Sequence, residues 1–324
     1  MIPTGMKSLI AGAMLVTGLT ATAFAQSPEK TSVKVGLAAQ TPAFLGLYLA
    51  DAEGLYDGLD VELVAFRSGS DLARAVVSGA VDVAAGALIE ALVPIQQGQP
   101  YKVFWGGMNN SVMDWYAIPS ISSIADSKGA RYGISSYGSL TDFVTRYALE
   151  KNGLNPETDV QIIPGGSSSA RLAAMEAGQL DVNLLIPPAK FVAAEKGYNK
   201  ILSQSDIAPD YPYEVLYASE SFIAENPNTV AALIDGIAKG VELAKSDGDR
   251  AIKEIEARTG VETKYATLAY DEIVKQLYAD GRLPTEAGMK AFWDVTIMSG
   301  EFAEVLPTSE WLDPTFIDEH ATAQ

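Results

Sequence analysis

The hydrophobic and polar positions of residues 131–154 predict a short strand, a loop of small residues and a helix. Ser139, with Asp142 three residues later, fits a capping box, so we expect the helix to begin at Ser139. Apolar residues then recur at helical spacing at Leu140, Phe143, Val144, Tyr147 and Ala148. A helix N-terminus has free N–H groups and a partial positive charge, so this loop is a candidate site for an anionic group. A plain strand-to-helix turn is the alternative.

This pattern occurs twice in the chain, at an offset of about 98 residues. Gly36 corresponds to Gly133, Gly69-Ser70 to Gly166-Ser167, and Asp82-Val83 to Asp181-Val182. Each copy contains, in order, a strand, a loop, a helix, Gly-Leu, a strand, a Gly-Ser loop, a helix and a short strand with Asp-Val. A repeat of this length indicates two similar lobes, because solenoid units are much shorter.

Strands that alternate with helices imply βαβ crossovers, so we predict an α/β fold in which each lobe has a mainly parallel sheet flanked by helices. Ligands of such sheets sit at the carboxyl ends of the strands, where the loops lie. Segments 106–110 and 209–213 mark two crossings between the lobes, and two crossings form a hinge that permits closure around a ligand. The expected ranges are 26–108 for the first part of lobe 1, 109–214 for lobe 2, and 215–324 for the return strand and C-terminal helices of lobe 1.

Residues 1–25 have the pattern of a secretory signal peptide. Lys7 gives a positive start, an apolar run follows, and Ala23-Phe24-Ala25 has the small-x-small form of a cleavage site. We therefore expect cleavage after Ala25 and export to a periplasm. No other segment is long and apolar enough to span a bilayer, because Asp82 and Glu90 interrupt the apolar run from Val81 to Ile95.

Charge and composition argue against several classes of function. The formal net charge of −18 argues against nucleic acid and anionic membrane surfaces as partners, although a local helix terminus can still hold an anionic ligand. The chain has no cysteine, and its one histidine, His320, cannot supply a triad or a histidine-rich metal site. A phosphate-binding Gly-x-x-x-x-Gly-Lys motif does not occur. We therefore predict no catalytic residue, metal or cofactor, and expect a binding protein that is not an enzyme.

A few larger side chains are candidates for the cleft. Phe44 lies in the first turn of a helix that Thr41 caps. Asn109 and Trp115 lie at the first crossing and are hinge or ligand candidates, with the core as the alternative for Trp115. Arg67 is either a cationic ligand contact or a solvated surface arginine.

Several stretches resemble the periplasmic solute-binding proteins of ABC importers for sulfonates, taurine, nitrate and thiamine-pyrimidine precursors. They are Ala-Glu-Gly-Leu at 52–55, Gly-Leu-Asp-Val-Glu-Leu at 58–63, Val-Ser-Gly-Ala-Val-Asp-Val at 77–83, and the segments 128–134, 137–142 and 170–181. The resemblance implies the type II periplasmic-binding-protein fold, with two lobes joined by two hinge strands and one small molecule bound between them.

The resemblance also implies positions for the ligand contacts. They are Gln40, Thr41, Ser68, Gly69, Ser70, Gly86, Ala87, Ser136, Tyr137, Gly138, Ser139, Leu140, Thr141 and Pro187. Tyr137 replaces a proline common at that place in the family, so its ring is a candidate to stack on a flat ligand. Together with Phe44 and Trp115, it favours a ring or apolar body that carries an acidic group over nitrate or a short alkyl sulfonate.

The implied function is that of a monomeric substrate-binding component that captures a small organic anion, either a sulfonate or a carboxylate, or a heteroaromatic compound. It would deliver this ligand to an ABC permease at the inner membrane, with no membrane insertion of its own. The alternatives are an enzyme on the same scaffold, similar to a pyrimidine-precursor synthase or a dehydratase, and a ligand-sensing protein. The synthase relies on cysteine and histidine residues that this chain lacks, and a receptor's sensor domain requires a membrane span.

Overall fold

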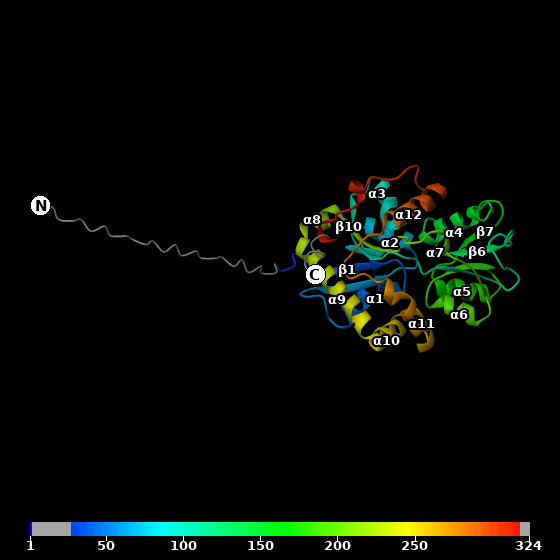
Figure 1. The fold of residues 1–324 in the computed structure, drawn as a ribbon, viewed down its shortest axis with the longest axis horizontal. Helices are drawn as coiled ribbons and strands as arrows, with labels where there is room; N and C mark the ends of the chain where they lie inside the picture. Colours follow the sequence, from blue (N-terminus) through cyan, green and yellow to red (C-terminus); the bar gives the residue numbers. More distant parts are fainter. Residues whose placement is uncertain (2–26, 318–324) are drawn as a thin grey trace.

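Two five-stranded sheets form the centres of two lobes (Figure 1). The structure is a computed structural model that describes residue 1 and residues 27–317. The predicted signal peptide and His320 therefore lie outside the described residues. Within the described part of the chain, no helix combines the length and the apolar character that a bilayer crossing requires.

Both sheets are mixed: four strands of each run in one direction, in keeping with the prediction of a mainly parallel sheet, and one strand is reversed. The first sheet has the order β2-β1-β3-β10-β4 and the second has the order β7-β6-β8-β5-β9. The strands are β1 (Ser32–Leu37), β2 (Asp60–Ala65), β3 (Val83–Gly86), β4 (Tyr101–Met108), β5 (Asp114–Ala117), β6 (Arg131–Ile134), β7 (Gln161–Pro164), β8 (Val182–Leu185), β9 (Asn199–Ser203) and β10 (Glu214–Ser219). β10 runs antiparallel to β3 and β4, and β5 runs antiparallel to β8 and β9. Each reversed strand comes directly after the chain has crossed from the other sheet.

Helices flank both sheets. Those that precede or follow strands of the first sheet are η1 (Pro42–Phe44), α1 (Leu45–Ala52), α2 (Gly69–Val77), α3 (Leu88–Gln96), α8 (Glu220–Glu225), α9 (Pro227–Ser246), α10 (Gly248–Thr259), α11 (Thr263–Ile273), η2 (Val274–Gln276), α12 (Glu286–Met298) and α13 (Thr308–Trp311). Those of the second sheet are α4 (Leu140–Lys151), α5 (Ser168–Glu176), α6 (Ala189–Glu195) and α7 (Gln204–Ile207).

The short strand β3 is buried on both faces, as expected for an inner strand of such a sheet. Val83 and Ala85 belong to the core cluster with α1 and α9, whereas Ala84 belongs to the cluster with α2 and α3. Because side chains alternate along a strand, these two clusters cover opposite faces of the sheet. The loop after β3 is thereby fixed from both sides, and it forms one wall of the site described below.

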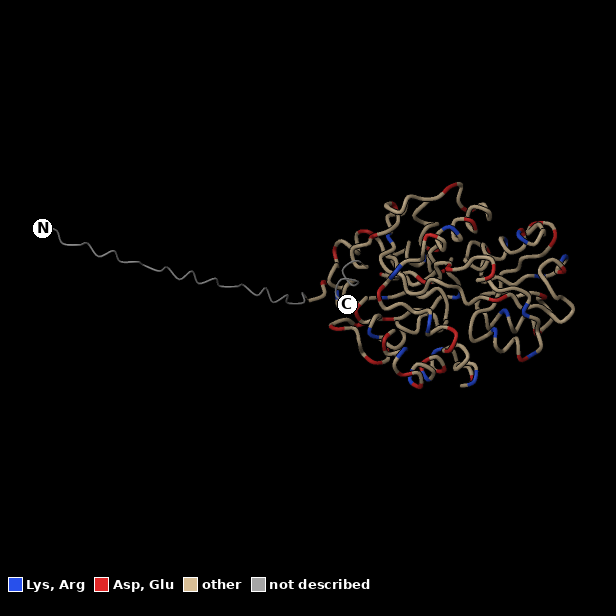
Figure 2. Tube along the Cα trace, viewed as in Figure 1, with Lys and Arg blue, Asp and Glu red and all other residues tan. Residues whose placement is uncertain are grey.

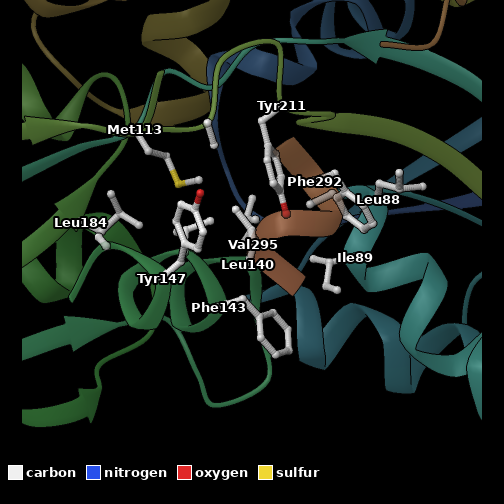
Figure 3. Close-up of a cluster of buried hydrophobic side chains, with 14 of the residues drawn as sticks. Leu88, Ile89, Met113, Leu140, Phe143, Tyr147, Leu184, Tyr211, Phe292 and Val295 are labelled. Atoms are coloured by element: carbon white, nitrogen blue, oxygen red, sulfur yellow. The ribbon is translucent and has the colours of Figure 1, made fainter. Parts of the chain in front are cut away.

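One hydrophobic cluster continues from the first lobe into the second. Leu88 of α3, Phe143 and Tyr147 of α4, and Phe292 of α12 are all buried in it (Figure 3). α12 thus packs against α4 of the second lobe, and its Phe292 shares one buried cluster with Leu88 of the first lobe. Acidic and basic residues are interspersed along the trace of both lobes (Figure 2).

Candidate functional site

A cavity of about 330 Å³ lies between the two lobes, at the carboxyl ends of the parallel strands. Of the predicted contacts, those that line it are Gln40, Thr41, Phe44, Ser68, Gly69, Gly86, Ala87, Leu140, Thr141 and Pro187. The N-termini of α2 and α5 both reach it, since Ser68 caps α2 and Ser167 caps α5. Arg67 also lines the cavity, although its side chain is mostly exposed.

The prediction that Trp115 faces the cleft is wrong. Its side chain is fully buried in the core and does not line the cavity. β5 lies between β8 and β9, so both of its faces are covered by packed helices and loops. The core alternative for Trp115 therefore holds. Asn109 does not line the cavity either; its Nδ2 donates to the backbone oxygen of Arg282 at 2.9 Å.

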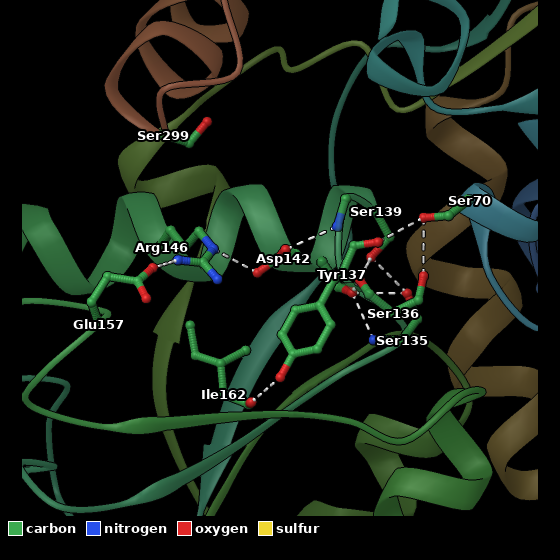
Figure 4. A network of polar contacts seen from close by, with 12 residues as sticks. Ser70, Ser135, Ser136, Tyr137, Ser139, Asp142, Arg146, Glu157, Ile162 and Ser299 are labelled. Carbon is green, nitrogen blue, oxygen red and sulfur yellow. Dashed lines mark hydrogen bonds and ion pairs between the residues drawn. The ribbon is translucent and has the colours of Figure 1, made fainter. Parts of the chain in front are cut away.

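The expected position of Tyr137 is also wrong. Its side chain is 56% exposed, and its hydroxyl donates to the backbone oxygen of Ile162 at 2.9 Å, outside the cavity (Figure 4). The neighbouring Gly138 and Ser139 do not line the cavity. The backbone N–H of Gly138 donates to the Asp142 carboxylate at 2.9 Å, so an acidic group of the chain already occupies this helix start.

The hydroxyl groups of this loop bond to one another. Helix α4 begins at Leu140 with Ser139 as its N-cap, as predicted, but the Ser139 hydroxyl donates to the backbone oxygen of Ser136 and makes no capping bond. Ser135 donates from its backbone N–H to Thr141 Oγ1 at 2.8 Å. Several donors of the loop are thus used within the chain, whereas Ser135, Leu140 and Thr141 line the cavity. An anion site at the start of α4 therefore stays a prediction.

Ser70 and Ser136 join the lobes at one rim of the cavity. The Ser136 hydroxyl donates to Ser70 Oγ at 3.0 Å, and the Ser70 hydroxyl donates to the backbone oxygen of Tyr137 at 3.1 Å (Figure 4). Both residues were predicted as ligand contacts. In the structure they do not line the cavity but hold its two sides together.

The most informative residue of the cavity is Arg171, which the sequence analysis did not single out. It lies in the first turns of α5 and is 2% exposed. Its guanidinium donates to the backbone oxygen of Gly166 at 2.7 Å, to that of Leu184 at 2.6 Å and to Ser168 Oγ at 3.2 Å. Its Nε is buried and has no partner among the described residues.

No carboxylate pairs with Arg171 in the described part of the chain, and burial lowers the pKa of its guanidinium to about 10. A buried cation without an anionic partner is costly, and a cation beside a cavity gains its partner when an anion binds. A sequence signal for this residue did exist. Arg171 lies four residues before Met175, on the buried face of α5, and an arginine on such a face requires polar partners.

Glu90 lies on the wall that the first lobe contributes. It is 7% exposed, and its Oε2 accepts a hydrogen bond from the Ala87 backbone N–H at 3.0 Å in the first turn of α3. Burial raises the pKa of its carboxyl to about 7. The sequence analysis placed Glu90 only as an interruption of an apolar run, because nothing local shows that its side chain turns toward a cleft.

The remaining wall is largely apolar. Its larger apolar side chains are Phe44, Phe66, Met113, Leu140, Leu172, Ile186, Val192 and Val261. Val261 belongs to the loop between α10 and α11, so a part of the chain far from the repeat also reaches the cavity. Pockets of this size with mainly apolar walls and a few convergent polar groups are typical of sites for small organic ligands.

Comparisons with known proteins show which sequences, structures and family this chain resembles. In sequence, the curated nitrate/nitrite binding protein NrtA of Nostoc sp. (strain PCC 7120 / SAG 25.82 / UTEX 2576) is 25% identical over 170 residues, which cover 50% of this chain and 38% of NrtA. The chain thus matches well under half the length of this relative.

Among solved structures, a protein from Bordetella bronchiseptica RB50 is similar with a TM-score of 0.81 and 25% identity, covering 92% of this chain and 99% of that one. The alkanesulfonate-binding protein SsuA from Xanthomonas axonopodis pv. citri, bound to MOPS, has a TM-score of 0.72 and 18% identity, covering 88% and 99%. An enzyme shares the fold as well: desulfurization enzyme DSZB has a TM-score of 0.64 and 15% identity, covering 91% and 99%.

These similarities confirm the two-lobe binding-protein fold. The family model described as "NMT1/THI5 like" matches residues 41–251, which include β2 to β10 and most of the residues that line the cavity from both lobes. The chain belongs to the NMT1/THI5-like family.

Proposed function

We propose that this chain is the substrate-binding component of an ABC importer, which captures a small organic anion between its lobes and delivers it to a membrane permease. The observation that carries the proposal is Arg171, a buried guanidinium beside the cavity, whose Nε has no hydrogen-bond partner and which has no carboxylate partner among the described residues. The names of NrtA and SsuA, which bind nitrate or nitrite and alkanesulfonate, support an oxyanion as the bound group.

The proposed ligand carries an apolar body in addition to its acidic group. The cavity of about 330 Å³ and its apolar side chains favour such a molecule over a bare inorganic anion. Phe44 and Phe66 supply aromatic surface on the first-lobe wall, in place of Trp115 and Tyr137. An organic sulfonate or carboxylate with a ring or branched chain fits this lining.

The setting of the protein is part of the proposal. We propose that residues 1–25 direct export to the periplasm, and that ranges 26–108, 109–214 and 215–324 divide the mature chain between lobe 1, lobe 2 and lobe 1 again. The sheet topology supports this division, because β4 ends at Met108 and β10 begins at Glu214. We further propose that the protein acts as a monomer.

Isothermal titration calorimetry with a panel of aryl and alkyl sulfonates and carboxylates tests the function, after native mass spectrometry of freshly purified protein for a co-purified anion. We expect at least one member to bind. Arg171→Lys keeps the charge but loses the planar fork, so it should weaken that binding at least tenfold. Arg131→Lys is the matched control, because Arg131 pairs with Asp181 and does not line the cavity.

Two outcomes would overturn the proposal. One is that neither the panel nor mass spectrometry of the wild-type protein gives a bound anion. The other is that folded Arg171→Lys, with an unchanged circular dichroism spectrum, binds as tightly as the wild type. Mass analysis of the ligand after incubation separates a binding protein from an enzyme on this scaffold: we expect the ligand to be recovered unchanged, and its conversion would favour the enzyme.

A further inference from the structure

Two ionisable groups of opposite type are buried on opposite sides of the cavity. Arg171 lies on the wall from the second lobe and Glu90 on the wall from the first lobe. Neither is joined to an oppositely charged side chain among the described residues. Each can therefore pair with an oppositely charged group of a ligand in the cavity.

The fold makes a niche for the Glu90 carboxyl. A Cβ on Gly69 would stand 1.5 Å from Glu90 Oε1, and a Cβ on Gly86 would stand 2.3 Å from Oε2. Only glycine at these two places lets the carboxyl enter, and both glycines line the cavity. Oε2 is bonded to the Ala87 N–H, whereas Oε1 accepts no hydrogen bond from the part of the chain that the structure describes.

This niche changes the electrostatics of the first-lobe wall. Gly69 is the first residue of α2, so the Glu90 carboxyl stands against the N-terminus of that helix, where a ligand anion would otherwise bind. On the second-lobe wall, the acidic residue is Glu176, which lies at the C-terminal end of α5 and pairs with Lys196 at 3.2 Å. Among the described residues, no acidic side chain pairs with Arg171 near the N-terminus of that helix. The two walls of the cavity are thus suited to opposite ends of one molecule.

We infer that the ligand is a dipolar organic ion, with its acidic group at Arg171 and a cationic nitrogen at Glu90, and that Glu90 selects for this nitrogen. The inference rests on the proposed function, which gives the acidic group of the ligand, and adds the cationic nitrogen. A nitrogen that donates to Oε1 completes a charge-assisted hydrogen bond in a buried site, which is stronger than a bond between neutral groups. The other titratable groups near Glu90 are Tyr211, Tyr213 and Tyr217, whose pKa values burial raises, so they stay neutral.

Two isosteric probes test the inference. 4-(Aminomethyl)benzenesulfonate and 4-ethylbenzenesulfonate have the same shape, and only the first carries a cationic nitrogen. We expect the wild type to bind the aminomethyl compound at least tenfold more tightly in calorimetry at pH 7.5. Glu90→Gln should abolish this preference. Glutamine still accepts from the Ala87 N–H, so the helix cap and the fold are retained.

Glu220→Gln is the matched control, because Glu220 also lies in the first turn of a helix of the first lobe, but 52% exposed and away from the cavity. It should keep the full preference. Three outcomes would overturn the inference while leaving the anion-binding function intact. The wild type could bind the two probes with equal affinity, it could bind the ethyl compound more tightly, or it could bind other anions of the panel but neither probe. Failure of every anion in the panel would instead remove the proposed function.

Discussion

Lys190 in α6 and Glu272 in α11 form an ion pair that joins the two lobes beside the cavity, with Lys190 Nζ 2.6 Å from Glu272 Oε1. The Lys190 side chain is almost fully buried, and its ammonium also contacts Asp114 Oδ2 at 2.8 Å. Within the second lobe Lys190 therefore has an anionic partner already, and Glu272 adds a link to the first lobe. Because α6 supplies Val192 to the cavity wall, this pair connects the relative position of the lobes to the shape of the site.

Replacing Glu272 by glutamine should weaken ligand binding. The change removes the charge of the link between the lobes but keeps a hydrogen-bond acceptor, so the closed arrangement loses stability while the cavity wall stays intact. Hydrogen bonds to charged groups are worth about 1.5–3 kcal/mol, so we expect affinity to fall at least tenfold in calorimetry. Small-angle scattering should show a larger radius of gyration at a given ligand concentration.

Glu195→Gln is the control for this experiment. Glu195 also pairs across the lobes, with Lys264 at 2.7 Å, but its side chain is 56% exposed. Exposed pairs contribute about 0–1 kcal/mol, so affinity should change less than about fivefold. Equal effects of the two substitutions, or none from Glu272→Gln, would show that the buried pair does not govern closure.

The fold was largely predictable from the sequence, because the helices, strands and loops of each repeat are determined by patterns of residues that are close in sequence. Helical spacing, N-caps at Thr41 and Ser139, and the recurring Gly-Ser loops each depend on residues close in sequence. The direction of β5 and β10 was not predictable in this way. A reversed strand has the same apolar pattern as a parallel one, and only its pairing partners, which are distant in sequence, determine its direction.

The sequence predicted which loops line the candidate site, but it did not predict the charged residues that the site contains. Gly69 and Pro187 line the cavity because they follow strands that end there. Arg171 and Glu90 were missed, since a charged residue within a helix is usually solvated, and only three-dimensional packing shows that both are buried. Tyr137 was assigned to the cleft by its place in a loop, but its ring turns to the other side of that loop.

Phe44 and Tyr137 should now differ in their effect on an aromatic ligand. Phe44 lines the cavity, whereas the Tyr137 side chain lies outside it. Phe44→Ala removes ring surface from the wall, so affinity for an aryl sulfonate that binds the wild type should fall at least tenfold. Tyr137→Ala should change it less than about threefold, because only the backbone oxygen of Tyr137 bonds to Ser70. A strong loss of affinity in Tyr137→Ala would instead show that the Tyr137 ring contacts the ligand.

Stability should fall as the pH rises from about 5 to about 8, because burial raises the pKa values of several carboxyl groups, and those of Glu90 and Glu214 most. Burial raises the pKa of Glu90 to about 7 and that of Glu214 to about 8, from 4.5 in both cases. Between these values the folded state keeps protons that the unfolded state has released, so their stabilising contribution is complete below about pH 4.5 and is lost above the folded pKa. For Glu90 this amounts to on the order of 3 kcal/mol.

Urea denaturation at pH 5, 6, 7 and 8 measures this dependence. Carboxylates whose pKa is lowered, such as Asp159 and Asp181, make the free energy of unfolding rise with pH, but they do so at lower pH. They therefore contribute little change between pH 5 and pH 8. Glu90→Gln should flatten the curve between pH 5 and pH 7 and leave the part due to the other carboxyl groups with raised pKa values, chiefly Glu214. A free energy of unfolding that rises over the whole range in the wild type would contradict the burial of both carboxyls in neutral form.

Gly69→Ala should destabilise the wild type and not the Glu90→Ala variant. Alanine is ordinarily favoured over glycine in a helix, by about 0.5–1 kcal/mol. At this position, however, its Cβ would stand 1.5 Å from Glu90 Oε1, so the carboxyl must leave its niche, and overpacking of this kind costs about 1–3 kcal/mol. Removing the carboxyl removes the conflict, so the sign of the effect should reverse in the double variant. A double-mutant cycle of unfolding free energies measures the difference, and additive effects would mean that the Glu90 carboxyl does not occupy the niche between Gly69 and Gly86.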